Sequence, residues 1–181
     1  DRRALIVGDV VVSWPHIAPG WAGLTLDNRQ HLKSVGKLAE AGDVEIVWPV
    51  HPNPNVNAPV HDLLGKTAHV TLLPHADYLP MVHLMQRACL VLTDSGGLQE
   101  EAPGLGVPVL VLRAVTERPE GVQAGTVRLV GTRAHRIVNA VSGLLDDPHA
   151  HAVMAQAANP YGDGKAAGRI VQAILEADPS D

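Results

Sequence analysis

Apolar runs and amphipathic stretches alternate along most of the chain. Runs rich in Val, Ile and Leu predict strands at residues 4–12, 44–50, 69–73, 89–92, 108–112 and 127–130. Apolar residues at helical spacing predict helices at residues 27–41, 56–64, 97–105, 132–145, 150–158 and 165–177, and one more that begins at Asp77. Strands that alternate with helices in this way are typical of an α/β fold.

The predicted strands are nearly continuous in apolar character, as expected for a parallel sheet that is covered on both faces. The sequence therefore predicts one Rossmann-like domain, a three-layer α/β/α arrangement with a mainly parallel sheet, within 181 residues. In such a sheet, ligands bind at the carboxyl ends of the strands. The polar segments 51–54, 94–97 and 113–120 each follow a predicted strand, so we expect them to meet at that edge.

The most informative segment reads Thr-Asp-Ser-Gly-Gly-Leu-Gln-Glu-Glu, at residues 93–101. Gly96 and Gly97 stand between a strand and a helix, where they let the backbone turn sharply and a ligand approach closely. The helix start offers free N–H groups and a positive dipole end, which suit a phosphate. Glu100 and Glu101 can accept hydrogen bonds from a vicinal diol such as a ribose. These residues favour a nucleotide or nucleotide sugar, although a tight connection and acidic residues that complement the helix dipole explain them equally well.

Two further loops carry candidate chemistry. Segment 113–120 holds Arg113 and Arg118, whose planar guanidinium groups suit phosphate; the alternative is a solvated loop with internal ion pairs. His51, in a double-proline turn, and His16, in a Pro/Gly-rich loop, are candidates for a ligand contact or a general acid, or are simply solvated. The spacing of the histidines indicates no metal site, and no cofactor is expected.

Composition excludes several classes of function. The net charge is −5 and no basic cluster occurs, so a nucleic-acid partner is not expected. No apolar run approaches ~20 residues, so the sequence predicts no membrane span, and its start does not read as a signal peptide. The single Cys89 excludes an internal disulfide and is more typical of a core residue than of a nucleophile. We expect a cytoplasmic location and, because an initiator Met is missing, a piece of a longer protein.

Several motifs follow one another between residues 44 and 176. They are PVHPNPNV at 49–56, DYL at 77–79, LTDSGGLQEEAP at 92–103, TERPE at 116–120, AGTV at 124–127 and NPYGDG at 159–164. Together they resemble the non-hydrolysing UDP-N-acetylglucosamine 2-epimerases. That family has a GT-B fold, with two Rossmann-like domains around a cleft. The resemblance implies that residues 1–181 are a single UDP-binding domain, the C-terminal half of such a fold.

The resemblance also implies roles for individual residues in binding UDP. Ser95, Gly96 and Gly97 would hold the diphosphate. Glu101 would accept hydrogen bonds from the ribose hydroxyls, and Arg118 would lie near the phosphates and the sugar.

Three more residues take positions that matter in the family. Met81 stands where relatives place a Phe near the uracil, and a Met packs on a flat base less specifically. His51 resembles the position that contacts a second, activating UDP-GlcNAc molecule. His16 keeps the His of the His-Arg-Arg-Glu-Asn motif and is the one catalytic candidate. Residues 17–20 replace the rest of that motif with uncharged side chains, so residues 1–43 depart from the family pattern.

The family interconverts UDP-GlcNAc and UDP-ManNAc, for cell-surface polysaccharide synthesis, by eliminating UDP and adding it back. Its key carboxylates lie mainly in the N-terminal domain, so the resemblance implies an isomerase half that has no turnover alone. The implied partners are UDP-GlcNAc or UDP, an N-terminal Rossmann-like domain and a second copy in a homodimer. The neutral residues 17–20 favour an alternative, a non-catalytic UDP-sugar-binding or interaction module. Half of a GT-B glycosyltransferase is a third possibility. The motif at 159–164 argues against it, because that motif resembles the epimerases in particular.

Overall fold

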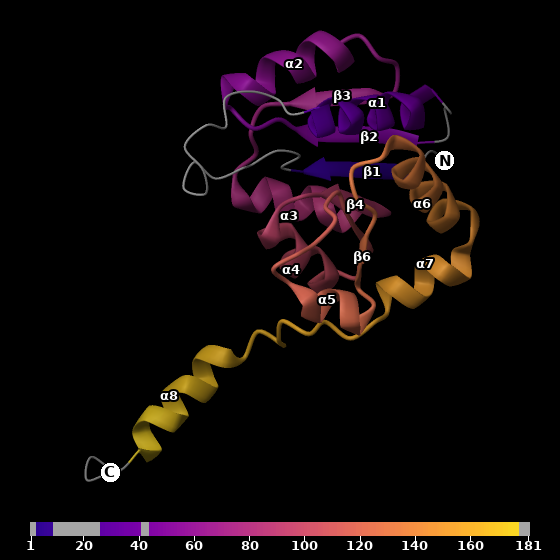
Figure 1. Ribbon diagram of the computed structural model, residues 1–181. Helices are drawn as coiled ribbons and strands as arrows, with labels where there is room; N and C mark the ends of the chain where they lie inside the picture. The colour runs from indigo at the N-terminus through magenta and orange to yellow at the C-terminus, as the bar shows by residue number, and fades with distance from the viewer. Residues whose placement is uncertain (1–2, 9–25, 41–43, 178–181) are drawn as a thin grey trace.

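Six strands form one parallel sheet in the computed structural model, which describes residues 3–8, 26–40 and 44–177. The strands are β1 (Arg3–Gly8), β2 (Val44–Pro49), β3 (Val70–Leu73), β4 (Leu90–Thr93), β5 (Val109–Val111) and β6 (Val127–Leu129). Their order across the sheet is β3-β2-β1-β4-β5-β6, and each pair of neighbours is parallel (Figure 1). The predicted Rossmann-like fold with a parallel sheet is confirmed.

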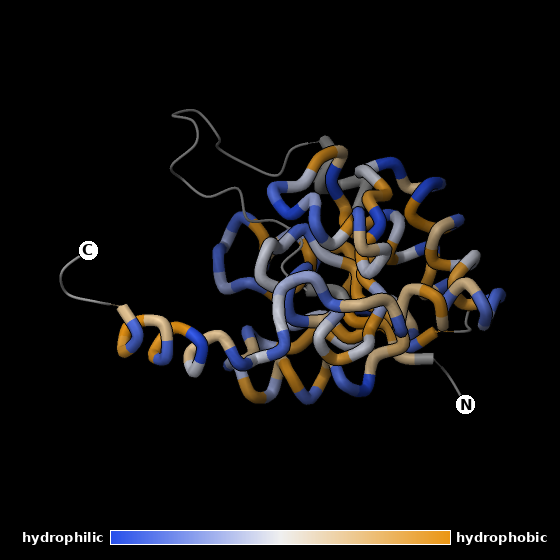
Figure 2. Tube along the Cα trace, turned by 90° about the horizontal axis from the view of Figure 1, so that it is seen from below, coloured by the Kyte–Doolittle hydropathy of each residue, from blue (hydrophilic) through white to orange (hydrophobic). Residues whose placement is uncertain are grey.

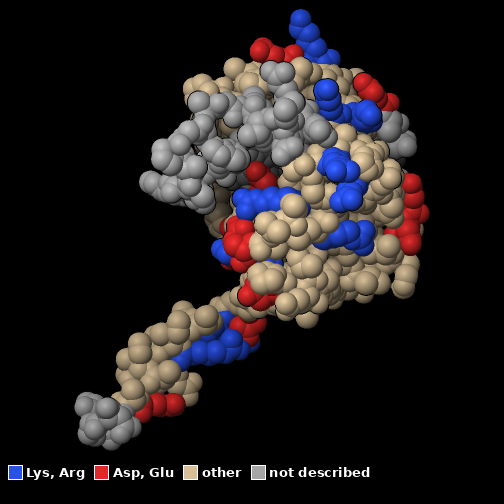
Figure 3. Space-filling view, viewed as in Figure 1, with Lys and Arg blue, Asp and Glu red and all other residues tan. Residues whose placement is uncertain are grey.

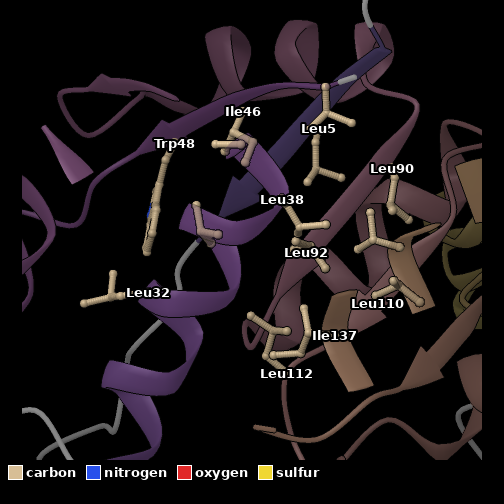
Figure 4. Close-up of a cluster of buried hydrophobic side chains, with 14 of the residues drawn as sticks. Leu5, Leu32, Leu38, Ile46, Trp48, Leu90, Leu92, Leu110, Leu112 and Ile137 are labelled. Atoms are coloured by element: carbon tan, nitrogen blue, oxygen red, sulfur yellow. The ribbon is translucent and has the colours of Figure 1, made fainter. Parts of the chain in front are cut away.

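Helices cover both faces of this sheet. The helices in the described residues are α1 (Leu26–Glu40), α2 (Pro54–Leu64), α3 (Tyr78–Arg87), α4 (Gly96–Gly104), α5 (Pro119–Ala124), α6 (Ala134–Asp146), α7 (Pro148–Ala155) and α8 (Ala166–Glu176). Successive strand residues point to opposite faces, so Leu90 and Leu92 join a cluster with α1, α2, α6 and α7, whereas Val91 joins one with α3 and α4. Figure 4 shows the first cluster, which contains the fully buried Trp48. The predicted three layers are confirmed.

Side-chain caps decide where two helices begin. The Asn53 side chain accepts a hydrogen bond from the backbone of the next helix, so α2 begins at Pro54, two residues earlier than predicted. The Asp147 carboxylate accepts two backbone N–H groups, so α7 begins at Pro148 instead of residue 150. Proline favours the first helical position because its missing N–H has no partner there in any case.

The sequence predictions missed one helix and assigned the wrong N-cap residue to another. Helix α5 (Pro119–Ala124) occupies part of the predicted loop 113–120 and ends at Gly125, whose φ of 81° is left-handed. Six residues are too few to show a helical period, so the only sequence signals for α5 are the Pro at its start and the Gly after its end. Helix α6 begins at Ala134, with Arg133 as its N-cap, and the prediction that Thr132 caps it is wrong.

Helix α8 (Ala166–Glu176) projects away from the sheet at the end of the described chain (Figure 1). It has no buried residue. Four of its apolar side chains are largely exposed: Ile170, Val171, Ile174 and Leu175. Figure 2 shows apolar and polar residues interspersed along it, clear of the other helices. None of the helices in the described ranges is both long enough and apolar enough to cross a membrane.

Candidate functional site

The order of the strands places the start of α4 at the switch point of the sheet. Strands β1 and β4 are neighbours in the middle of the sheet, and the chain progresses from them toward opposite edges. A ligand crevice opens at such a switch point, at the carboxyl ends of the strands. Helix α4 follows β4 directly, so its N-terminus lies at this position. The segment after β1, which contains His16, lies outside the described residues.

The turn between β4 and α4 leaves the start of the helix open. The Thr93 hydroxyl accepts a hydrogen bond from the Ser95 backbone N–H at 2.9 Å. Ser95 is the N-cap residue with an extended backbone, yet its side chain makes no capping hydrogen bond. The first N–H groups of a helix have no intrahelical partner, and together with the helix dipole they attract anions. The start of α4 is therefore chemically suited to a phosphate.

Little space separates Gly96 from the loop that follows β5. A Cβ atom at Gly96 would lie 2.8 Å from Glu117 Oε1 and 3.9 Å from Arg118 Nη2. At Gly97, a Cβ atom would lie 3.8 Å from both Ser95 Oγ and Glu101 Oε1, which is an ordinary contact. The structure thus brings together five residues that the sequence singled out: Ser95, Gly96, Gly97, Glu101 and Arg118.

A buried glutamine joins this loop to the turn before α4. Gln99 is fully buried, and its Nε2 donates to the Ser95 carbonyl oxygen at 3.1 Å. Its Oε1 accepts from the Thr116 hydroxyl at 2.6 Å, and that hydroxyl accepts the Arg118 backbone N–H at 3.0 Å. The sequence reasoning missed both Gln99 and Thr116. The available signal was a long polar residue beside Leu98 on the apolar side of α4.

Two ion pairs lie around the start of α4. Arg113 and Glu117 form an ion pair within the loop, with Nη1 and Oε2 2.8 Å apart, as the solvated-loop alternative predicted for Arg113. Arg118 instead reaches out of the loop to pair with Glu100 on α4. Burial raises the pKa of the Glu101 carboxyl, and the neighbouring Glu100 charge raises it further.

Two more candidates, Met81 and His51, have partners elsewhere in the described residues. Met81 on α3 is partly buried and packs against the apolar cluster on that face. His51 follows β2, accepts the Asn53 backbone N–H on Nδ1 at 3.1 Å and lies edge-on to His75, with ring centroids 6.1 Å apart. Strand β1 separates β2 from β4, a distance of about 10 Å at the usual strand spacing.

Other reactive side chains have structural partners. Cys89 is partly buried against the core and donates its thiol to the Ala4 carbonyl oxygen at 2.8 Å, as expected of a structural cysteine. Its own carbonyl oxygen accepts a hydrogen bond from His151 Nε2 at 2.7 Å. In the described part of the chain, no three His, Cys, Asp or Glu side chains are grouped to hold a metal ion. Figure 3 shows acidic and basic residues interspersed on one face.

Comparison with known proteins identifies the family of this chain. A family model for UDP-N-acetylglucosamine 2-epimerase matches residues 25–175. The UDP-N-acetylglucosamine 2-epimerase of Escherichia coli K12 is 58% identical over 132 residues, which are 73% of this chain and 35% of that protein. The Neisseria meningitidis UDP-GlcNAc 2-epimerase, solved bound to UDP-GlcNAc, is 37% identical with a TM-score of 0.83 over 97% of this chain and 45% of that one.

A third relative is the Staphylococcus aureus protein MnaA, solved in a co-structure with UDP. It is 36% identical, with a TM-score of 0.84 over 96% of this chain and 46% of that one. The chain therefore spans less than half the length of each of these relatives. Because the family model matches most of its length, the chain belongs to the UDP-N-acetylglucosamine 2-epimerase family.

Proposed function

We propose that this chain is the UDP-binding part of a UDP-N-acetylglucosamine 2-epimerase. The observation that carries the proposal is the uncapped start of α4 at the switch point of the sheet, with Arg118 and Glu101 beside it. The diphosphate is held by the Ser95 hydroxyl and by the backbone at Gly96 and Gly97, and Arg118 adds a cation to the same group. Solved relatives with UDP or UDP-GlcNAc support this ligand.

Of the two neighbouring glutamates, Glu101 is the better partner for the ribose. Glu100 already pairs with Arg118, whereas the Glu101 carboxylate faces Gly97. A carboxylate accepts two hydrogen bonds from a vicinal diol. Hydroxyl donors would offset the desolvation that raises the pKa of Glu101 in the unliganded protein.

Three other residues complete the proposed site. Met81 packs on the uracil, and His51 contacts a second UDP-GlcNAc molecule that activates the enzyme. His16 acts as an acid or base near C2 of the sugar. These roles follow the family pattern and the position of each residue after a strand or on the helix before β4.

Helix α8 supports a second domain in the whole protein. Four apolar side chains exposed to water on a projecting helix raise the free energy of the molecule unless another surface covers them. An N-terminal Rossmann-like domain, facing this one across a cleft, supplies that surface in our proposal. The whole protein would interconvert UDP-GlcNAc and UDP-ManNAc, as a cytoplasmic homodimer. A non-catalytic UDP-sugar-binding module is the second candidate, favoured by the uncharged residues 17–20.

Isothermal titration calorimetry with UDP tests the proposed binding. We expect weak binding that Ser95→Ala and Glu101→Ala each reduce about tenfold or more, because a charge-assisted hydrogen bond contributes roughly 1.5–3 kcal/mol. Asp62→Ala is the matched control, since it removes an exposed carboxylate from α2. Binding by the wild type that neither Ser95→Ala nor Glu101→Ala weakens would place the site elsewhere.

A further inference from the structure

The turn between α7 and α8 contacts two elements of the proposed UDP site. At its start, Asn159 Nδ2 would lie 3.2 Å from a Cβ atom at Gly104, the last residue of α4. The Asn159 side-chain oxygen accepts the Tyr161 backbone N–H at 3.2 Å, which fixes the direction of the turn. Tyr161 then reaches the start of α5, so this turn bridges α4 and α5.

The Tyr161 hydroxyl serves as a cap for α5 from a distant part of the chain. Arg118 is the N-cap residue of α5, but its guanidinium has no acceptor and makes no capping hydrogen bond. The Tyr161 hydroxyl accepts the Gly121 backbone N–H at 3.1 Å and lies 3.4 Å from the Arg118 carbonyl oxygen, to which it donates. One hydroxyl therefore satisfies a third-position N–H of the helix and the carbonyl just before it.

Gly121 leaves the space that this contact requires. A Cβ atom there would lie 2.8 Å from the Tyr161 hydroxyl oxygen and 3.0 Å from a methyl carbon of Val127. On the other side, the Gly121 carbonyl oxygen accepts hydrogen bonds from the Thr126 backbone N–H and hydroxyl, at 3.1 and 3.2 Å. The first turn of α5 is thus fixed between Tyr161 and β6.

The same turn is tied to α8. The Asp163 carboxylate accepts the Lys165 backbone N–H at 3.1 Å. It also receives two hydrogen bonds from Arg169 on α8, at 2.9 and 2.7 Å. A paired fork of this kind restrains orientation as well as distance. The turn therefore connects α8, through Asp163, with the residue that precedes α5, through Tyr161.

We propose that Tyr161 is a positioning residue for Arg118: its hydroxyl holds the start of α5 so that the Arg118 side chain lies beside Glu100 and Gly96. This inference rests on the proposed function, because Arg118 acts on the UDP phosphates there. Without the hydroxyl, the Arg118 carbonyl and the Gly121 N–H lose their shared partner, and the start of α5, which carries Arg118, is held less firmly.

A double-mutant cycle on this chain tests the proposal, with UDP and uridine as the two ligands. Tyr161→Phe should weaken UDP binding about five- to tenfold, the range expected for one neutral hydrogen bond, and leave uridine binding unchanged. In an Arg118→Ala background, Tyr161→Phe should have no further effect on UDP affinity. Tyr78→Phe is the matched control, because Tyr78 is 70% exposed on α3.

The outcomes separate this inference from the proposed function. If Arg118→Ala binds UDP as the wild type does, the phosphate site is wrong and the inference falls with it. If Arg118→Ala weakens binding but Tyr161→Phe does not, or if the two effects multiply, only the role of Tyr161 is overturned. If Tyr161→Phe folds poorly, a second measurement uses Gly121→Ala, whose added Cβ displaces the Tyr161 hydroxyl. The NMR resonance of the Arg118 Nε–H is then compared between Gly121→Ala and the wild type. It should shift relative to the wild type, and an unshifted resonance would overturn the inference.

Discussion

Glu100 and Glu101 are neighbours in the sequence but have different surroundings. Glu100 pairs with the guanidinium of Arg118. Burial raises the pKa of the Glu101 carboxyl, and the nearby Glu100 charge raises it further. The difference assigns one carboxylate to holding the arginine and leaves the other for the ligand.

The raised pKa of Glu101 predicts how stability depends on pH. The pKa of Glu101 is higher in the folded chain than in the unfolded chain. At a pH above the folded-state pKa, the ionised carboxylate therefore lowers the free energy of unfolding. At a pH below the unfolded-state pKa, the carboxyl is protonated in both states and has no such effect. Glu101→Gln should therefore raise the melting temperature at pH 7, and the gain should vanish as the pH falls below the ordinary glutamate range. Asp62→Asn, at an exposed site, is the control. Thermal melts of the wild type and both variants at several pH values test this prediction. A gain in melting temperature that grows as the pH falls would contradict the raised pKa of Glu101.

At the scale of elements, helix caps can be tested by paired substitutions. Asp147→Ala should lower the free energy of unfolding by about 1 kcal/mol, because its carboxylate accepts two backbone N–H groups of α7. Asp77→Ala should lower the free energy of unfolding by a smaller amount, because Asp77 occupies the N-cap position of α3 without a side-chain hydrogen bond. Urea unfolding of both variants measures the difference. An equal loss in the two would show that the cap at Asp147 contributes nothing specific.

The pattern of apolar residues predicts the strands, the long helices and the layered fold, because apolar residues recur along the sequence with the period of the buried face. It does not predict α5, since six residues carry no period, nor the starts of α2 and α7, which depend on caps at Asn53 and Asp147. The predicted 4–12 strand is described only as Arg3–Gly8.

The site was predictable to a similar degree. A glycine pair after an apolar run points to the start of α4, and the parallel sheet explains why Arg118 comes near it. The roles of Gln99 and Tyr161 were not predictable, because each connects segments that are 17 to 40 residues apart in the sequence. Such contacts become visible only once the chain is folded.

For the whole molecule, we propose that this site forms one side of a cleft. The chain spans about 35% of the length of the E. coli relative, and in our proposal the carboxylates of the reaction belong to another domain. We therefore expect no UDP-ManNAc when the 181-residue chain is incubated with UDP-GlcNAc and followed by NMR. Turnover above a buffer control that disappears in Glu101→Ala would contradict this expectation.

The most direct test of the central claim is an NMR titration of the ¹⁵N-labelled chain with UDP, which locates the ligand residue by residue. We predict that the largest amide shifts occur at Ser95, Gly96, Gly97 and Arg118. The groove between α1 and α2, which Gly36 lines, serves as an internal control and should not respond. In Gly96→Val, whose side chain would enter the space beside Glu117, the shifts should disappear while the fold remains. Unchanged amides at the start of α4 at millimolar UDP, or wild-type shifts in a folded Gly96→Val protein, would show that this turn is only a connection.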